Sequence, residues 1–164
     1  MRGTWWIILA AVFAIVPYTA HAQAVVSERT LSYAAAVEMA TTALAECRKD
    51  GYKVTITVLN RAGRTKVVLH DDGANPHTIE NSMRKAYTSL TFRAPSGDFG
   101  KRITANPQGA GVLHLDKVTT LEGALPIVSN KEVIGSIGVS GAPGGDKDAK
   151  CAQIGIDKIA AGLN

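Results

Sequence analysis

Two β-hairpin patterns, separated by a helical one, constrain the fold of this chain most. Residues 54–59 alternate Val, Ile and Val with Thr, a turn follows at 60–63, and residues 66–70 resume an extended apolar run. A second pair of runs, 125–128 and 132–139, flanks a short turn, and the latter run is rich in glycine. Because no strand–helix–strand unit repeats evenly, we predict an antiparallel sheet.

Helical periodicity surrounds the first hairpin. Apolar residues recur at three- and four-residue spacing over 31–49, with Thr30 as the expected N-cap. A second helix is expected from Asn75 and Pro76 to about Thr91, because Asn can cap free amides and Pro suits a first turn. Each helix carries an apolar stripe that can pack against the sheet.

The remaining segments complete the predicted architecture. Residues 101–122 are rich in Gly, Asn, Pro and Thr, and they predict a long irregular connection with one short strand near 112–118. A terminal helix is expected after the loop at 142–145, capped by Asp146 or Asp148. Together these elements predict an α+β fold, a single domain with an antiparallel sheet of about five strands flanked by helices.

The N-terminal stretch predicts export. A positive charge precedes an apolar run over 5–16, and the small residues Ala20 and Ala22 complete a signal-peptidase pattern. We therefore predict a signal peptide at residues 1–22, a mature domain at residues 23–164, and a periplasmic or secreted location. A retained membrane anchor is the alternative, but about a dozen apolar residues fall short of the roughly 20 that span a bilayer.

Charge and cysteine content bound the partners and the compartment. Once Arg2 leaves with the signal peptide, 17 basic and 14 acidic side chains give a scattered net charge of +3. This balance is too mild to indicate nucleic acid, so we expect no nucleic-acid partner. An oxidising exterior would let Cys47 and Cys151 form a disulfide if the fold brings them together.

Histidines are the candidate metal ligands of the mature chain. No GxSxG, HExxH, GxxxxGK or strand-to-helix GxGxxG motif is present. His70 ends a predicted strand, His77 lies in the first turn of the second helix, and His114 lies in the irregular connection. A compact fold could gather all three segments, although a surface or hydrogen-bonded role is the alternative for each histidine.

A planar, apolar cofactor would need an axial ligand, a wall of small residues and a cation for its carboxylates. His77 is the candidate ligand, and Gly135 and Gly138 are candidates for the wall. The candidate cations are Arg84, Lys85 and Arg102, and for each of them a solvated helix face is the alternative.

Several segments, taken in order, resemble one known family. They are the alanine-rich helix from Leu31, residues 58–64, 72–74 and 84–88, and a tail with 125–127, 133–141, Asp148 and 151–152. Over nearly the whole mature length the chain resembles the GlcG/HbpS-like haem-binding protein family. The resemblance implies a compact α+β domain, assembly into homo-oligomers, and haem binding or sensing outside the cell. It implies no particular axial ligand, because that residue varies across the family.

The leading hypothesis is therefore an exported, non-catalytic protein that captures or buffers haem. His77 is the first candidate for the ligand of the haem iron, with His114 or His70 behind it. The alternatives are an oligomeric interaction module without a haem role, such as the partner of a membrane sensor protein, and a domain that binds another small molecule. A small-molecule-modifying enzyme is the weakest hypothesis, because it would rest on the Ser140-Gly141 turn alone.

Overall fold

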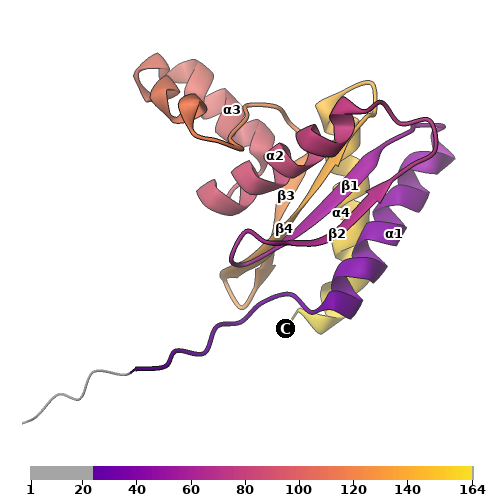
Figure 1. Ribbon diagram of the computed structural model, residues 1–164, viewed down its shortest axis with the longest axis horizontal. Helices are drawn as coiled ribbons and strands as arrows, with labels where there is room; N and C mark the ends of the chain where they lie inside the picture. The colour runs from indigo at the N-terminus through magenta and orange to yellow at the C-terminus, as the bar shows by residue number, and fades with distance from the viewer. Residues whose placement is uncertain (1–23, 164) are drawn as a thin grey trace, which may run out of the picture.

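The computed structural model describes residues 24–163, and the predicted signal peptide at residues 1–22 lies outside the described residues. Both predicted hairpins and all three predicted helices are present (Figure 1). Between residues 24 and 163 no helix combines the length and the apolarity needed to cross a membrane. The elements in chain order are α1 (Tyr33–Lys49), β1 (Thr55–Asn60), β2 (Thr65–His70), α2 (His77–Phe92), α3 (Ser96–Ala105), the 3-10 helix η1 (Pro107–His114), β3 (Ala124–Ser129), β4 (Glu132–Ser140), α4 (Gly145–Ile159) and the 3-10 helix η2 (Ala160–Gly162).

The four strands form one antiparallel sheet in the order β2-β1-β4-β3. The two hairpins meet along β1 and β4, where Ile56 lies opposite Val139 and Thr57 lies opposite Gly138. The fold is the predicted single α+β domain, although the sheet described here has one strand fewer than expected.

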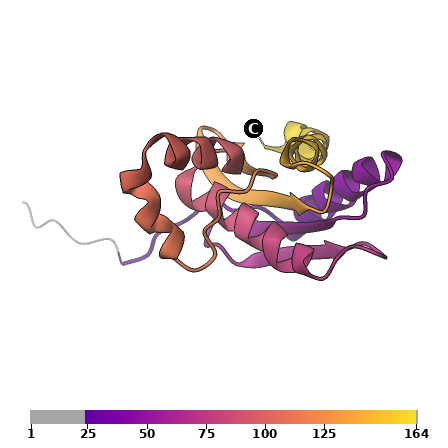
Figure 2. The same cartoon turned by 90° about the horizontal axis from the view of Figure 1, so that it is seen from above.

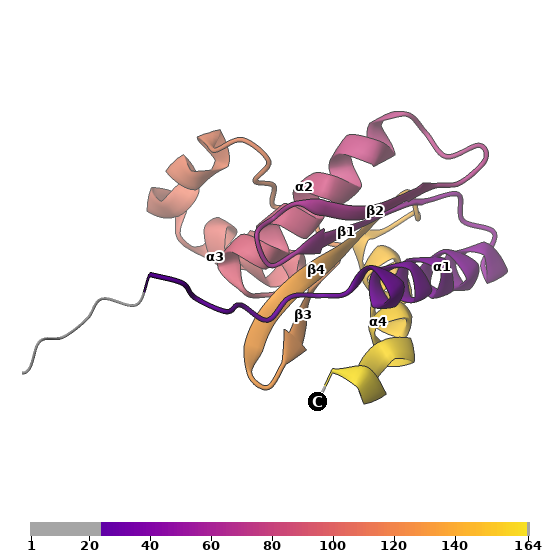
Figure 3. The same ribbon diagram turned by 60° about the horizontal axis from the view of Figure 1, so that its bottom comes forward.

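Helices cover both faces of this sheet. α1 and α4 lie together on one face, and α2 lies on the other (Figure 3). The alternation within β1 decides which face is which, because successive side chains of a strand point to opposite sides. Ile56 and Val58 belong to the core under α1 and α4, whereas Thr55 and Thr57 contact α2. The threonines that interrupt the apolar run therefore mark the face that receives α2.

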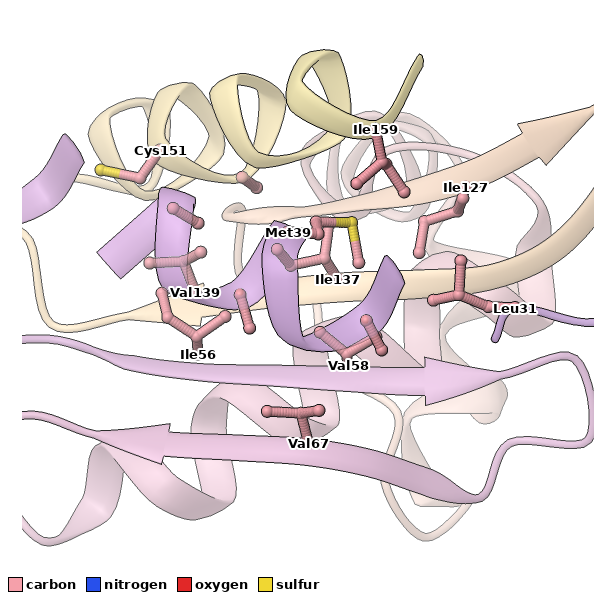
Figure 4. Close-up of a cluster of buried hydrophobic side chains, with 14 of the residues drawn as sticks. Leu31, Met39, Ile56, Val58, Val67, Ile127, Ile137, Val139, Cys151 and Ile159 are labelled. Atoms are coloured by element: carbon pink, nitrogen blue, oxygen red, sulfur yellow. The ribbon is translucent and has the colours of Figure 1, made fainter. Parts of the chain in front are cut away.

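The face under α1 and α4 holds the apolar core (Figure 4). Met39 of α1 is fully enclosed there with Ile56, Ile137 and Val139 of the central strands. α1 approaches α4 closely because Gly155 has no side chain, and a Cβ at that position would lie 2.7 Å from the carbonyl oxygen of Met39. Close packing of this kind makes the interface sensitive to any added volume.

A disulfide joins the two helices of the apolar face. Cys47 of α1 and Cys151 of α4 are bonded, with their Cα atoms 5.6 Å apart, and both are buried. The pairing expected for an oxidising exterior is confirmed, because the first and last helices pack side by side.

Helix starts differ in detail from the prediction. Ser32, rather than Thr30, caps α1, and its hydroxyl accepts a hydrogen bond from the amide of Ala35 at 3.2 Å. Neither α2 nor α4 has a side-chain cap, so the expected caps at Asn75, Asp146 and Asp148 were wrong. Asp148 does not cap α4 because its carboxylate instead accepts a hydrogen bond from Lys85 of α2.

The prediction of an irregular connection with a strand near 112–118 was also wrong. α3 and η1 occupy much of this segment, and they stand at one end of the molecule, away from α1 and α4 (Figure 2). Phe99 anchors α3 by stacking on Phe92, with ring centroids 4.0 Å apart. Glycine, proline and asparagine obscured the helical period, and tertiary contacts such as this stacking hold the helix in place. We call α3 and η1 together the α3–η1 lobe.

Candidate functional site

Hydroxyl groups attach α2 to its face of the sheet. The Oγ1 atoms of Thr55 and Thr78 are 2.6 Å apart, and Thr57 Oγ1 lies 2.7 Å from Ser82 Oγ. All four residues are fully buried. Hydrogen bonds are directional, so these contacts hold α2 in one rotation and one register against the sheet.

The glycine-rich strand β4 receives α2 closely. Ser136 donates from its hydroxyl to the carbonyl oxygen of Ala86 at 2.8 Å. A Cβ at Gly138 would lie 2.8 Å from the nitrogen of Ala86, so α2 itself fills the space expected for a cofactor there. At Gly135 a Cβ would lie 2.5 Å from the carbonyl oxygen of Leu59. Both glycines therefore face neighbouring backbone of this chain.

Lys85, in the middle of α2, is buried against Asp148 of α4. Its Nζ donates to Asp148 Oδ2 at 2.7 Å and to the carbonyl oxygen of Val139 at 3.1 Å, and Asp148 Oδ1 accepts from the amide of Ala142 at 3.0 Å. Burial raises the pKa of the Asp148 carboxyl above its ordinary value, while the Lys85 ammonium and the backbone amide oppose that rise. Lys85 is thus committed to a carboxylate of this chain.

A hollow opens where α2 begins and β4 ends. It has a volume of about 400 Å³ and is lined by His77, by Ser140 and by residues of the 141–145 loop. Asn81 of α2 also lines it, and its Nδ2 donates to Ser140 Oγ at 3.0 Å. An adjoining hollow of about 370 Å³ shares His77 and Asn81 and extends to Arg84. We call the two together the His77 hollow.

The His77 hollow combines an imidazole, a cation and the apolar side chain of Leu121. His77 is exposed, and its ring makes no hydrogen bond within residues 24–163. Arg84, about two turns further along α2, makes only a loose exposed ion pair with Glu80 at 3.7 Å. Leu121, which lines both parts of the hollow, is 51% exposed, which is unusual for a large apolar side chain.

His70 is connected to the same end of α2, through hydrogen bonds. Its Nδ1 lies 2.7 Å from Thr55 Oγ1, and Thr55 in turn contacts Thr78 in the first turn of the helix. The structure therefore brings Arg84 and His77 to one hollow, and it links His70 to the first turn of α2 through one threonine pair.

The other two candidates lie in the α3–η1 lobe. His114 is the last residue of η1 and is exposed. Arg102 of α3 places its guanidinium 5.4 Å from the centre of the Phe99 ring and 5.9 Å from that of Phe92. Stacking on aromatic rings gives Arg102 a packing role within the lobe.

Sequence reasoning missed two polar side chains of the His77 hollow. Asn81 lies four residues after His77, a spacing that places both on one side of a helix and could have pointed to it. Asp148 carried no such signal, because its role depends on Lys85 at a separation of 63 residues. Across residues 24–163 no cluster of three or more His, Cys, Asp or Glu side chains is arranged to hold a metal ion.

Fold and site together define a class of protein. It is a single α+β domain in which a helix, held to a four-stranded antiparallel sheet by hydroxyl contacts, presents a histidine and an arginine at a surface hollow. Within that class the chain belongs to the HbpS-like family, because the family model described as haem degrading protein HbpS-like matches residues 31–157. The membership predicted from the sequence is confirmed.

Known proteins support both the membership and the fold. A structure of an HbpS double mutant from Streptomyces reticuli is 32% identical, with a TM-score of 0.77 over 88% of this chain and 97% of that one. Protein GlcG of Escherichia coli is 27% identical over 95 residues, 58% of this chain and 69% of GlcG. PduOC, solved as a complex with heme, is 20% identical with a TM-score of 0.72 over 79% of this chain and 95% of PduOC, and it shares the fold.

Proposed function

We propose that this protein is exported and binds haem without transforming it, capturing or buffering the cofactor, with His77 as the axial ligand of the iron. The observation that carries the proposal is the placement of His77, whose exposed ring opens on a hollow that it shares with Arg84. A neutral imidazole nitrogen is a common ligand of haem iron, and a guanidinium pairs well with a carboxylate.

The residues of the His77 hollow fit a planar, apolar ligand with carboxylates at its edge. Leu121 offers apolar surface in the same hollow as the imidazole, and Arg84 offers a cation that Glu80 holds only loosely. Haem would supply the iron and the visible absorption, whereas the chain supplies the ligand nitrogen, the apolar contact and the charge. Lys85 is left out of this role, because Asp148 already holds its ammonium.

Related proteins support haem as the ligand. The family description names haem, and PduOC, which shares the fold, was solved as a complex with heme. The family description also names degradation, so the non-catalytic part of the proposal needs its own test.

Export is supported by the disulfide. Cys47 and Cys151 are paired and buried, and structural disulfides persist mainly in oxidising compartments outside the cytoplasm. With the predicted signal peptide at residues 1–22, this favours a periplasmic or secreted location. Assembly into homo-oligomers and contact with a membrane sensor protein belong to the same proposal, and native mass measurement and periplasmic pull-down test them.

The decisive experiment is a haemin titration of protein expressed with its N-terminal stretch and recovered from the periplasm. We expect a shift of the Soret band that His77→Ala abolishes and Arg84→Gln weakens by about tenfold or less. His114→Ala is the matched control, since it removes an exposed histidine from the α3–η1 lobe and should leave the spectrum unchanged.

Three outcomes would contradict separate parts of the proposal. An unaltered haemin spectrum on mixing would rule out haem binding and favour the interaction module. A wild-type spectrum with His77→Ala would reject His77 as the ligand while keeping haem. Loss of the Soret band after addition of ascorbate in air, absent from a control with haemin and serum albumin, would show turnover and reject a non-catalytic role.

A further inference from the structure

A separate cavity lies at the opposite end of α2 from His77. The turns of both hairpins meet the last residues of the helix there, and they enclose about 670 Å³. Arg61 comes from the first turn, Lys131 from the second, and Arg93 from the end of α2. This volume falls within the roughly 300–1,000 Å³ that sites for small organic ligands occupy.

The cavity carries uncompensated positive charge. Glu132 is its single acidic lining residue, and it is paired with Arg61 at 2.8 Å. Arg93 and Lys131 have no carboxylate within ion-pair distance in the part of the chain that the structure describes. Two free cations therefore face one cavity, each from a different element of the fold.

The backbone at these two cations is held in a conformation that favours glycine. Arg93 has φ 54° and Lys131 has φ 66°, and of residues 24–163 only two other non-glycine residues, Lys117 and Asn130, have positive φ. Both are neighbours of the cavity, since Asn130 precedes Lys131 and the Lys117 ammonium lies 5.6 Å from the centre of the Tyr87 ring that lines it. Residues in such sparsely populated conformations cluster at functional sites.

Stability alone does not explain cations at these positions. The carboxyl end of a helix attracts positive charge, which accounts for Arg93 but not for Lys131 in a hairpin turn. Glycine would suit either backbone better. Both side chains are exposed and unpaired with a carboxylate among the described residues, so their charge is available to an anionic ligand.

We propose that this cavity binds a small organic anion, with carboxylate or phosphate groups held by Arg93 and Lys131. The apolar body of the ligand packs against Tyr87 and Leu90, which line the same cavity. The site shares no lining residue with the His77 hollow and is independent of haem.

The test is a titration of the isotope-labelled, haem-free protein followed by two-dimensional amide NMR. Phenyl phosphate and phthalate probe the two anionic groups on an aromatic body, and inorganic phosphate probes the charge alone. We expect saturable shifts at Arg93 and Lys131 with at least one aromatic probe, weaker binding of inorganic phosphate, and affinity that falls as salt rises.

Glycine variants separate binding from folding. Arg93→Gly and Lys131→Gly should each weaken the affinity by about tenfold while the midpoint of thermal unfolding stays the same or rises. Asn130→Gly is the matched control, because it makes the same backbone change in the same turn without removing a charge, and its affinity should stay within about twofold. Absence of saturable shifts with all three probes, or wild-type affinity in both charge variants, would overturn the proposal.

Discussion

The two faces of the sheet come from the same strands but are built with different chemistry. Under α1 and α4 the contacts are apolar, as at Ile56 and Val58, and a disulfide closes them. Under α2 the contacts are hydroxyl pairs, as at Thr55 and Thr57. No buried side-chain polar atom lacks a hydrogen-bond partner among residues 24–163. The face under α1 and α4 thus contributes buried apolar surface, and the face under α2 contributes directional hydrogen bonds.

The magnitudes show what each face contributes. Truncating a buried Ile or Leu to Ala costs about 2–5 kcal/mol, whereas a neutral hydrogen bond contributes a net of about 1 kcal/mol. The α1–α4 face is therefore the main source of stability. The α2 face places the helix, and through it His77 at one end of the sheet and Arg93 at the other. Substitutions on the two faces should separate these roles.

The largest effect is expected at the buried ion pair that joins Lys85 of α2 to Asp148 of α4. Asp148→Asn leaves the Lys85 ammonium buried without a carboxylate, so the free energy of unfolding should fall by about 3–5 kcal/mol. Urea unfolding monitored by circular dichroism measures it. The double variant Lys85→Met/Asp148→Leu should recover most of the loss, because no unpaired charge remains. A loss below about 1 kcal/mol in Asp148→Asn would show that the pair is not strongly coupled.

The second-largest loss of stability is expected when the disulfide of the apolar face is removed. Replacing Cys47 and Cys151 together with Ala removes a bridge across 104 residues, and the free energy of unfolding should fall by about 2–4 kcal/mol. The amide NMR signals of α2 should stay in place, since the bridge lies on the other face. Large changes in α2 signals would show that the faces are not separable.

A matched pair of neighbouring substitutions sharpens the comparison. Thr57→Val removes a hydroxyl under α2, and Ile56→Val removes a methylene under α1 and α4; each should cost about 1 kcal/mol. Ser82 keeps the carbonyl of Ile79 as an acceptor, so its hydroxyl is not left unpaired. Although the two variants should lose similar stability, Thr57→Val should shift the amide NMR signals of α2 more than Ile56→Val does. Equal shifts in both variants would reject the placing role of the hydroxyl pairs.

The smallest effect is expected at the edge of the apolar face, where Arg48 of α1 holds Asp71. Hydrogen bonds from the guanidinium to both carboxylate oxygens lower the pKa of Asp71 below its ordinary value. A lowered folded-state pKa stabilises the fold above the unfolded-state pKa, and this contribution is lost as pH falls. The stability difference between wild type and Asp71→Asn should therefore be present at neutral pH and shrink below about pH 4. A stability difference between the two proteins that stays constant as the pH falls would contradict the lowered pKa of Asp71.

Much of the fold was predictable because its signals are local. The alternation of Thr with Val and Ile in β1 predicted a strand, and the spacing of apolar residues in α1 predicted an amphipathic helix; both follow from side-chain geometry a few residues apart. α3 was missed because its glycine-rich sequence has weak helical preference and its anchor, Phe99, acts through Phe92. Tertiary contacts overrode local preference there.

The candidate site was likewise predictable from the sequence only in part. His77 was named from the sequence as a candidate axial ligand and Arg84 as one of three candidate cations, and the structure places both at one hollow. The role of Lys85 could not be derived, because a lysine on an amphipathic helix is ordinarily solvated and its partner Asp148 lies in another helix. The cavity with Arg93 and Lys131 carried no linear signal either.

The sequence by itself determined the class of fold, the family and the residues available for chemistry, since periodicity, turn residues and ordered motifs are properties of neighbouring positions. Tertiary structure alone decided that α2 packs on the threonine face, that Cys47 meets Cys151, and that Lys85 is buried while Arg84 is only loosely paired with Glu80. The physical reason is that burial, ion pairing and disulfide bonding depend on distances between residues far apart in the chain, which no local pattern encodes.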